Sequence, residues 1–334
     1  MNKEVTLVTG GDGFIGRHLV SALLSRGNFV RCLVRKKTEF SKKHSDLEIV
    51  CGDLRDAESL KKNVQNVTKV YHTAAQVGPA KLWYKRDKLR DDYLEINVLG
   101  TLNLLKACEN SRIKKFIYYS SISAAGLGDN LDEQSLCNPI TDYGKSKLLT
   151  ENLLVNFYKK NNFPVIIIRP AQVFGPHNVR MLTVFKLIQK GIMPTLGCGD
   201  NRISFCYIDS LVNNSLLVEE KGSCGETYFF SDYEYTVKDA AIIIAEIMKV
   251  HPPRIYLPKS GMYPAAFLKR IFEKIFFVSI YPFHIDFSKP ALLTASSSWT
   301  CSNKTACELG YFTEIEFREA MRRTISWYQA NKLL

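Results

Sequence analysis

Short apolar runs alternate with amphipathic stretches through the first half of the chain. The apolar runs are predicted strands and cover residues 5–8, 29–34, 69–72, 116–119 and 165–168. The amphipathic stretches are predicted helices, because they repeat apolar side chains at helical spacing over residues 14–26, 94–110 and 143–160. Strand–helix alternation indicates parallel βαβ units with right-handed crossovers. The pattern therefore predicts an α/β fold built on a doubly wound parallel sheet.

The alternation loosens at about residue 175, beyond which Pro, Gly and aromatic residues become denser. A chain of 334 residues has the length of about two domains. We predict a core over residues 1–175, with contributions from about 201–232. Residues 176–334 would then form mainly a smaller, interleaved C-terminal lobe.

Composition adds several exclusions. An apolar fraction of 46% and a charged fraction of 23% are ordinary for a globular protein and exclude a mostly disordered, collagen-like or coiled-coil chain. The nine cysteines are scattered without a CxxC pair, so neither a disulfide framework nor a metal site is predicted. No apolar run reaches the ~20 residues that span a bilayer, and Thr9-Gly10-Gly11 interrupts the first one. We therefore expect a cytoplasmic protein.

A basic excess of 45 − 33 = +12 charges favours anionic partners. The basic residues are dispersed, so nucleic-acid binding is not expected. Residues 262–283 combine basic residues with Phe267, Phe272 and Phe276 at helical spacing. This segment has three interpretations: a core helix of the lobe, a lid over an apolar substrate, or an interfacial helix giving peripheral membrane contact.

A glycine-rich turn follows the first predicted strand and opens the first predicted helix. Gly10, Gly13 and Gly16 stand three residues apart within Thr9 to Gly16. Glycine permits a tight turn and a close approach of the backbone to a pyrophosphate, and the helix N-terminus supplies N–H donors. The strand before it and the helix after it give the context that this motif requires. The turn predicts a dinucleotide-binding site.

The end of the second strand bears on which dinucleotide binds. An NAD site usually has a carboxylate there for the ribose 2′-OH. Here Val34 takes that place and Arg35 follows, which suits a 2′-phosphate because arginine can bind it bidentately. NADP is therefore favoured, with NAD as the alternative, and a solvated basic turn is the other interpretation of Arg35. Asp53 is a candidate acceptor for the adenine amino group.

Three residues suggest proton transfer. Tyr143 and Lys147 lie one helical turn apart, and Ser121 follows a predicted strand of the parallel sheet. A free tyrosine has a pKa near 10, and a neighbouring ammonium brings it toward neutral pH. The carboxyl edge of a parallel sheet, where Ser121 falls, is where such folds bind ligands.

The ordered motifs resemble the extended short-chain dehydrogenase/reductases, within the NAD(P)-dependent epimerase/dehydratase group. They are TGGDGFIG at 9–16, GDL at 52–54, HTAA at 72–75, NVLGTLNLL at 97–105, YYSSISAAG at 118–126, YGKSK at 143–147, RPAQVFGP at 169–176 and NRISFCYIDSLV at 201–212. The resemblance implies an enzyme with a Rossmann core and a substrate lobe. It implies Tyr143 as the general acid/base and Lys147 as the residue that lowers its pKa and holds the ribose. It also implies Ser121 as the residue that orients the substrate oxygen and Asn97 as a support for a water or a substrate group. It further implies cofactor contacts from Gly10, Gly13, Phe14, Ile15, Gly16, Arg35, Asp53, Leu54, Ala74, Ala75, Tyr143, Lys147, Pro170 and Val173.

Three further segments are VRCLVRKK at 30–37, FIYYSSISAAG at 116–126 and ACELGYFTEIEFREAMRRTISWY at 306–328. Within that group, they most resemble 3β-hydroxysteroid dehydrogenase-like and dihydroflavonol reductase-like enzymes. Ser121 is followed by Ile122-Ser123 instead of the Asp-Glu pair of the dehydratases. The resemblance implies hydride exchange between a nicotinamide and a secondary alcohol or ketone of a hydrophobic small molecule. Nucleotide-sugar epimerisation with retained NAD(P) is the alternative, because Arg202 falls where epimerases bind a substrate diphosphate. A surface turn is the other interpretation of Arg202.

Three further expectations come from the resemblance and from spacing. Trp83 falls in the family's substrate loop and is a candidate substrate contact, with simple packing as the alternative. Asp209 is expected to cap a helix that begins at Ser210. Many relatives form homodimers through the helices at 94–110 and 143–160, so a homodimer is implied.

Overall fold

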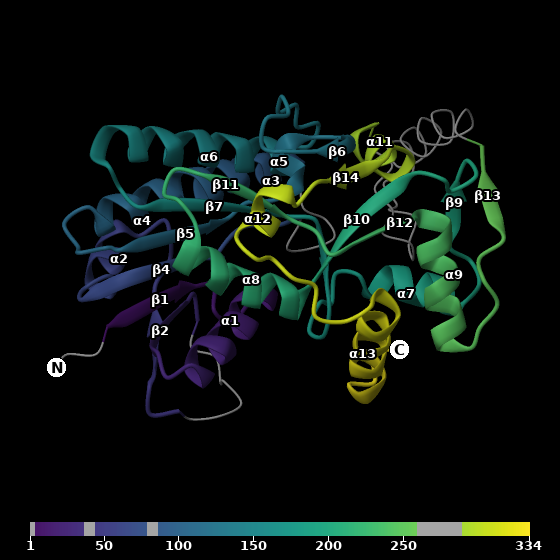
Figure 1. The fold of residues 1–334 in the computed structure, drawn as a ribbon, viewed down its shortest axis with the longest axis horizontal. Helices are drawn as coiled ribbons and strands as arrows, with labels where there is room; N and C mark the ends of the chain where they lie inside the picture. The colour runs from purple at the N-terminus through teal and green to yellow at the C-terminus, as the bar shows by residue number, and fades with distance from the viewer. Residues whose placement is uncertain (1–3, 37–43, 79–85, 259–288) are drawn as a thin grey trace.

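Seven parallel strands form the main sheet, on the left of Figure 1. In the computed structural model, which describes residues 4–36, 44–78, 86–258 and 289–334, their order is β11-β7-β5-β4-β1-β2-β3. They are β1 (Val5–Thr9), β2 (Phe29–Val34), β3 (Leu47–Cys51), β4 (Val67–His72), β5 (Lys115–Tyr119), β7 (Val165–Pro170) and β11 (Thr227–Phe230). The order reverses at β1, where β2 lies on one side and β4 on the other. Ligands bind such sheets beyond the carboxyl ends at this reversal.

Helices cover both faces of this sheet. They are α1 (Phe14–Ser25), α2 (Ala57–Asn63), α3 (Arg86–Asp92), η1 (Tyr93–Leu99), α4 (Gly100–Cys108), α5 (Ile122–Ala125), α6 (Asp142–Asn161) and α8 (Ile208–Lys221). Side chains from α1 and α8 pack in one apolar core, and side chains from α2, α4 and α6 pack in a second. The layers are therefore helix, sheet, helix.

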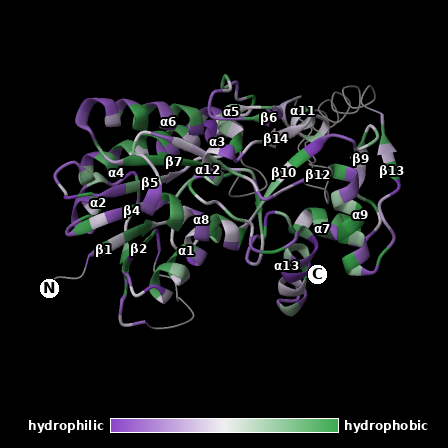
Figure 2. Ribbon diagram, viewed as in Figure 1, coloured by the Kyte–Doolittle hydropathy of each residue, from purple (hydrophilic) through white to green (hydrophobic). Residues whose placement is uncertain are grey.

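The strands show why both faces are covered. Successive side chains of a strand point to opposite faces. Val8 accordingly lies in the first core and Leu7 in the second, and both are fully buried. The same alternation places Ile117 in the first core and Phe116 in the second. Figure 2 shows these strands as largely apolar segments between helices of mixed character.

The right-hand part of Figure 1 is a smaller lobe. Its larger sheet has the order β12-β10-β14-β6 with β8 also paired to β10, and β13 pairs with β9 separately. The strands are β6 (Gly128–Leu131), β8 (Gln172–Phe174), β9 (Pro194–Leu196), β10 (Arg202–Tyr207), β12 (Tyr233–Thr236), β13 (Ile255–Leu257) and β14 (Trp299–Cys301). The helices are α7 (Leu182–Gln189), α9 (Val237–Met248), α11 (Lys289–Ser296) and α13 (Phe317–Ala330), whereas α12 (Lys304–Glu308) lies against β11 of the main sheet.

The doubly wound α/β class is confirmed. All five predicted strands and the helices predicted at 14–26 and 143–160 are present, with boundaries that differ by one or two residues. The helix predicted over 94–110 is a π-helical turn, η1, followed by α4. The segment 262–283 and Trp83 lie outside the described residues. In the described part of the chain, no helix has the length and apolar character needed to cross a membrane.

Candidate functional site

The turn between β1 and α1 can form only with glycine at several positions. Gly10 has a φ of +66°, and a Cβ there would lie 2.9 Å from Cα of Ala74. A Cβ at Gly16 would lie 2.2 Å from the carbonyl oxygen of Gly10. Gly13 is the N-cap of α1 and supplies no side-chain cap, so N–H groups of the first turn are left for an anion.

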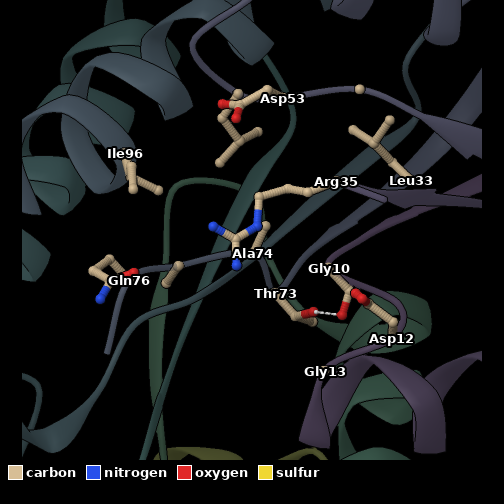
Figure 3. A pocket seen from close by; sticks show the side chains of 13 residues that line it. Gly10, Asp12, Gly13, Leu33, Arg35, Asp53, Thr73, Ala74, Gln76 and Ile96 are labelled. Carbon is tan, nitrogen blue, oxygen red and sulfur yellow. Dashed lines mark hydrogen bonds between the residues drawn. The ribbon is translucent and has the colours of Figure 1, made fainter. Parts of the chain in front are cut away.

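A pocket opens beyond the carboxyl ends of β1 to β4 (Figure 3). The residues that line it follow these strands or come from η1. They are Gly10, Asp12, Gly13, Leu33, Arg35, Gly52, Asp53, Leu54, Thr73, Ala74, Ala75, Gln76 and Ile96. The pocket lies at the reversal of strand order. It contains Gly10 and Gly13 of the glycine turn together with five further residues predicted to contact a cofactor: Arg35, Asp53, Leu54, Ala74 and Ala75.

Arg35 and Asp53 differ in how they are engaged. The Arg35 side chain extends across the pocket in Figure 3, and in the described part of the chain its guanidinium forms no ion pair with a carboxylate. Asp53 instead accepts two bonds from the Arg55 guanidinium, at 3.0 and 2.7 Å. This hydrogen bonding with Arg55 holds the pKa of Asp53 below its ordinary value. Arg35 is thus available to a ligand, whereas Asp53 is a fixed carboxylate.

Tyr143 lies in the first turn of α6 and faces Ser121. The Thr141 hydroxyl caps α6 by accepting from the Gly144 amide, and Ser121 is the N-cap of α5. The Ser121 side chain lies close enough to the Tyr143 hydroxyl to lower its pKa. Burial raises the pKa of Tyr143, whereas the positive charge of Arg180 and the nearby Ser121 hydroxyl lower it. The two side chains therefore lie together, as proton transfer through a tyrosine requires.

Lys147 lies under this tyrosine and is 3% exposed. Its Nζ donates to the carbonyl oxygen of Tyr119 at 2.6 Å and lies 5.9 Å from the centroid of the Tyr143 ring. Burial lowers the pKa of Lys147 to about 7, and the charge of Glu151 acts in the opposite direction. A proton can therefore be gained or lost at Lys147 near neutral pH.

Asn97 connects the pocket with α6. Its Oδ1 accepts from the backbone amide of Gln76 at 2.7 Å. Its Nδ2 donates to the backbone carbonyl oxygen of Gln76 and to the Ser146 hydroxyl. Gln76 lines the pocket, and Ser146 lies next to Lys147. Asn97 is in the π-helical turn η1, an irregularity that is frequent at functional sites. The amide is thus engaged with protein groups.

The other predicted site residues lie outside the pocket lining. Phe14, Ile15 and Gly16 form the first turn of α1, Pro170 ends β7, and Val173 is in β8. Arg202 is on β10, exposed, and forms an ion pair with Glu234 of the neighbouring strand β12. The structure therefore gives Arg202 a carboxylate partner within the small lobe.

The expected cap at Asp209 is wrong. The helix α8 begins at Ile208, directly after β10, and Tyr207 is its N-cap without a side-chain bond. Asp209 is consequently inside the first turn, where its carboxylate lies 3.9 Å from Nδ1 of His18. A strand that continues straight into a helix leaves no turn for a capping side chain.

Two neighbours of the site were missed at the sequence level. Glu151 lies one helical turn beyond Lys147 and forms a buried ion pair with Arg169. Arg180 lies over Gly78, with its Nη1 3.0 Å from where a Cβ of that residue would be. The i, i+4 spacing from Lys147 could have indicated Glu151. Arg180 lies in a loop, where no periodicity marks a residue.

The pocket suits a dinucleotide by its own geometry. The glycine turn brings backbone and an uncapped helix N-terminus to the pocket, which suits a pyrophosphate, and Arg35 provides a positive charge within the same pocket. No group of three His, Cys, Asp or Glu side chains among the described residues could hold a metal ion. The fold and the site define an enzyme of the Rossmann class that binds a dinucleotide.

Comparisons with known proteins agree with this class. The sequence model of the family described as "NAD dependent epimerase/dehydratase family" matches residues 6–229. Sterol demethylase protein B of Methylococcus capsulatus is 28% identical over 98% of this chain and 99% of its own. The 3 beta-hydroxysteroid dehydrogenase/Delta 5-->4-isomerase of Mycobacterium tuberculosis is 30% identical over 68% of this chain and 65% of its own.

A solved structure extends the likeness to the whole fold. The crystal structure of gox2253 superposes with a TM-score of 0.82 at 26% identity and covers 99% of this chain and 100% of its own. Nucleotide-sugar epimerases and dehydratases are also among the matches. The chain belongs to the NAD-dependent epimerase/dehydratase family, as an enzyme of the extended short-chain dehydrogenase/reductase type.

Proposed function

We propose that the protein is an NADP(H)-preferring dehydrogenase or reductase for a secondary alcohol or ketone on a hydrophobic, sterol-like, lipid-like or polycyclic molecule. The observation that carries the proposal is the gathering of Tyr143, Ser121 and the buried Lys147 beside a dinucleotide pocket that contains Arg35. The sterol-related names of two relatives favour this substrate class.

Each part of the site has a task in this reaction. The glycine turn would hold the pyrophosphate and Arg35 a 2′-phosphate, while Ala74, Ala75, Pro170 and Val173 would contact the rest of the cofactor. The nicotinamide supplies hydride exchange with the carbinol or carbonyl carbon. Ser121 orients the substrate oxygen, and Tyr143 donates or removes the proton on it. The ammonium of Lys147 stabilises the tyrosinate.

The test is turnover of a panel of 3β-hydroxysteroids and other polycyclic secondary alcohols with NADP⁺ or NAD⁺, followed at 340 nm. We expect Tyr143→Phe to lower kcat by about 10²-fold or more, since general acid–base catalysis contributes 10²–10⁴-fold. Binding of NADPH, measured by fluorescence, is the control and should be retained. Normal turnover by the Phe variant would overturn the proposal.

The nucleotide-sugar epimerase alternative predicts a different signal. An epimerase returns the hydride to its substrate, so it changes the sugar without net change at 340 nm. The engagement of Arg202 by Glu234 weakens the main reason for this alternative, which was a free arginine for a diphosphate. Conversion of UDP-glucose without net cofactor reduction would favour the epimerase.

We also propose a homodimer built on the pair of helical segments η1 and α6. Leu94 and Leu99 of the first are 40% and 53% exposed, and Leu149 of the second is 48% exposed. Apolar side chains on neighbouring helices are the kind of surface that a second copy covers. Cytoplasmic location with peripheral membrane contact stays a prediction from the composition and from segment 262–283.

A further inference from the structure

Glu151 of α6 and Arg169 of β7 form a buried ion pair behind the candidate site. Nε of Arg169 donates to Oε1 of Glu151 at 3.0 Å, and Nη2 donates to Oε2 at 2.6 Å. The two side chains are only 4% and 7% exposed. The Ser120 hydroxyl donates to Oε1 as well. A carboxylate with a bidentate guanidinium and a third donor is fixed in place.

These three residues join the elements that carry the site. Glu151 lies on the helix of Tyr143 and Lys147, Ser120 directly precedes Ser121, and Arg169 is the penultimate residue of the neighbouring strand β7. A buried ion pair is weak evidence for stability, because a well-packed apolar set often serves the fold as well. The placement beside the site suggests another role.

That role follows from the surroundings of Lys147. Its Nζ lies 4.6 Å from the centroid of the Tyr118 ring on β5 and 5.9 Å from that of Tyr143 on its own helix. From β4 it faces His72, whose pKa is lowered to about 3 by burial and by the charge of Lys147, so that this histidine is neutral. Among these neighbours, only Glu151 provides a negative charge, and its oxygens are engaged by Arg169 and Ser120 instead of by Lys147.

Burial opposes the charge that Lys147 needs. Desolvation lowers the pKa of Lys147 and the carboxylate of Glu151 raises it, and the two together leave it at about 7. A neutral amine cannot stabilise a tyrosinate. Without a negative charge nearby, Lys147 would therefore be largely neutral at pH 7, and its effect on Tyr143 would be lost.

We propose that Glu151, clamped by Arg169 and Ser120, is a positioning residue whose charge keeps Lys147 an ammonium ion beneath Tyr143. The assignment rests on the proposed function, in which Lys147 serves Tyr143. Glu151 touches neither substrate nor cofactor in this role. The clamp keeps the carboxylate from pairing directly with Lys147, which leaves the ammonium directed at Tyr119 and the tyrosine.

The test is the pKa of Lys147, measured by NMR of the side-chain nitrogen in protein labelled with ¹³C,¹⁵N-lysine. The signal that disappears in Lys147→Arg identifies the residue. A unit charge one helical turn away in a partly screened interior shifts a pKa by about one unit or more. We expect Glu151→Gln to lower the pKa of Lys147 by about one unit, and Glu151→Asp, which retains the charge, to restore most of the difference.

The matched control is Glu219→Gln. Glu219 of α8 is 15% exposed, forms an ion pair with Lys69 at 2.8 Å and accepts from the Tyr71 hydroxyl. The same chemical change there should leave the pKa of Lys147 unchanged. An equal shift in both variants would overturn the proposal, because the shift would then reflect a general loss of packing.

Glu151→Gln leaves the buried guanidinium of Arg169 without its carboxylate, which is strongly destabilising. The double variant Glu151→Gln/Arg169→Met removes both charges, and the pKa of Lys147 should still fall. An unchanged pKa of Lys147 in either variant that folds overturns the proposal. Loss of fold in both variants also overturns it, because the Glu151–Arg169 pair would then serve stability. The measurement needs no substrate. Normal turnover by Tyr143→Phe would thus overturn the proposed function separately.

Discussion

At the scale of single residues, the sequence identified candidates but not their bonds. The motif around Tyr143 and Lys147 selects residue types and spacing, and the structure adds the Ser121 contact and the burial. Arg202 shows where this reasoning stops. Its partner Glu234 lies on a strand that pairs with its own, and a contact across 32 positions leaves no mark in local spacing.

Arg35 gives a prediction on cofactor choice. Arg35→Asp should raise the Kd for NADPH by tenfold or more and lower that for NADH, because loss of a charge-assisted bond costs about 1.5–3 kcal/mol. Fluorescence titration of both cofactors measures the change. Lys36→Asp is the control, since Lys36 is the exposed neighbour and does not line the pocket. An Arg35 variant with unchanged preference would refute the NADP assignment.

Lys147 gives a prediction on pH. Its folded-state pKa of about 7 lies below the ordinary 10.5, so the unfolded chain binds more protons between these pH values. The free energy of unfolding should therefore rise with pH across that window, by at most about 1.4 kcal/mol per pH unit from this group.

Urea unfolding of the wild type and of Lys147→Met measures this contribution. The difference in unfolding free energy, wild type minus variant, should increase from pH 7 to pH 9. A difference that stays constant over this range would mean that Lys147 has an ordinary pKa in the folded protein.

At the scale of elements, the sequence predicts those helices and strands that are long enough to repeat an apolar pattern. The helix over 143–160 and the strands of the main sheet contain enough residues to show one. In the small lobe, β14 has three residues and pairs with β10 and β6, which lie about 100 and 170 positions away. Such strands depend on non-local pairing, and no local pattern reveals them.

The first turn of α1 gives a prediction at this scale. Gly16→Ala would place a Cβ 2.2 Å from the carbonyl oxygen of Gly10, which must shift the glycine turn. We expect NADPH binding to weaken by tenfold or more. Isothermal titration calorimetry measures the loss.

Gly27→Ala is the matched control. Gly27 follows the same helix with a φ of +75°, and a Cβ there would meet nothing within 4 Å. The variant should lower stability by about 1 kcal/mol, because of the left-handed backbone, and leave NADPH binding unchanged. Equal effects of the two substitutions on binding would show that the turn tolerates a side chain.

At the scale of the whole molecule, the class of fold and the family followed from the order of motifs, and the comparisons confirm both. The division at residue 175 stays a prediction. The structure nonetheless returns the chain to the main sheet at β11 after β10 has joined the lobe. The main sheet and the lobe are thus interleaved along the sequence, because their strands pair with partners far away in the chain.

Assembly gives the prediction at this scale. Leu99→Glu combined with Leu149→Glu should convert a homodimer into a monomer, because a charge cannot be buried in an apolar contact without a partner. Sedimentation velocity measures the state. Phe312→Glu is the control, since Phe312 is 50% exposed and its backbone bonds to Asn214 of α8, which packs in the other core from α6. A wild-type monomer at micromolar concentration would overturn the dimer.

The bond between α13 and the loop after β8 has a consequence for synthesis. The Tyr328 hydroxyl donates to the carbonyl oxygen of Asn178, and Asn178 in turn accepts from the amide of Arg180, the cation near Tyr143. A ribosome makes residues 317–330 long after the glycine turn and Tyr143, the candidate acid/base. The glycine turn and the pocket beside it can therefore form before α13 has been made. The loop that carries Arg180 gains its bond to Tyr328 only after α13 has been made.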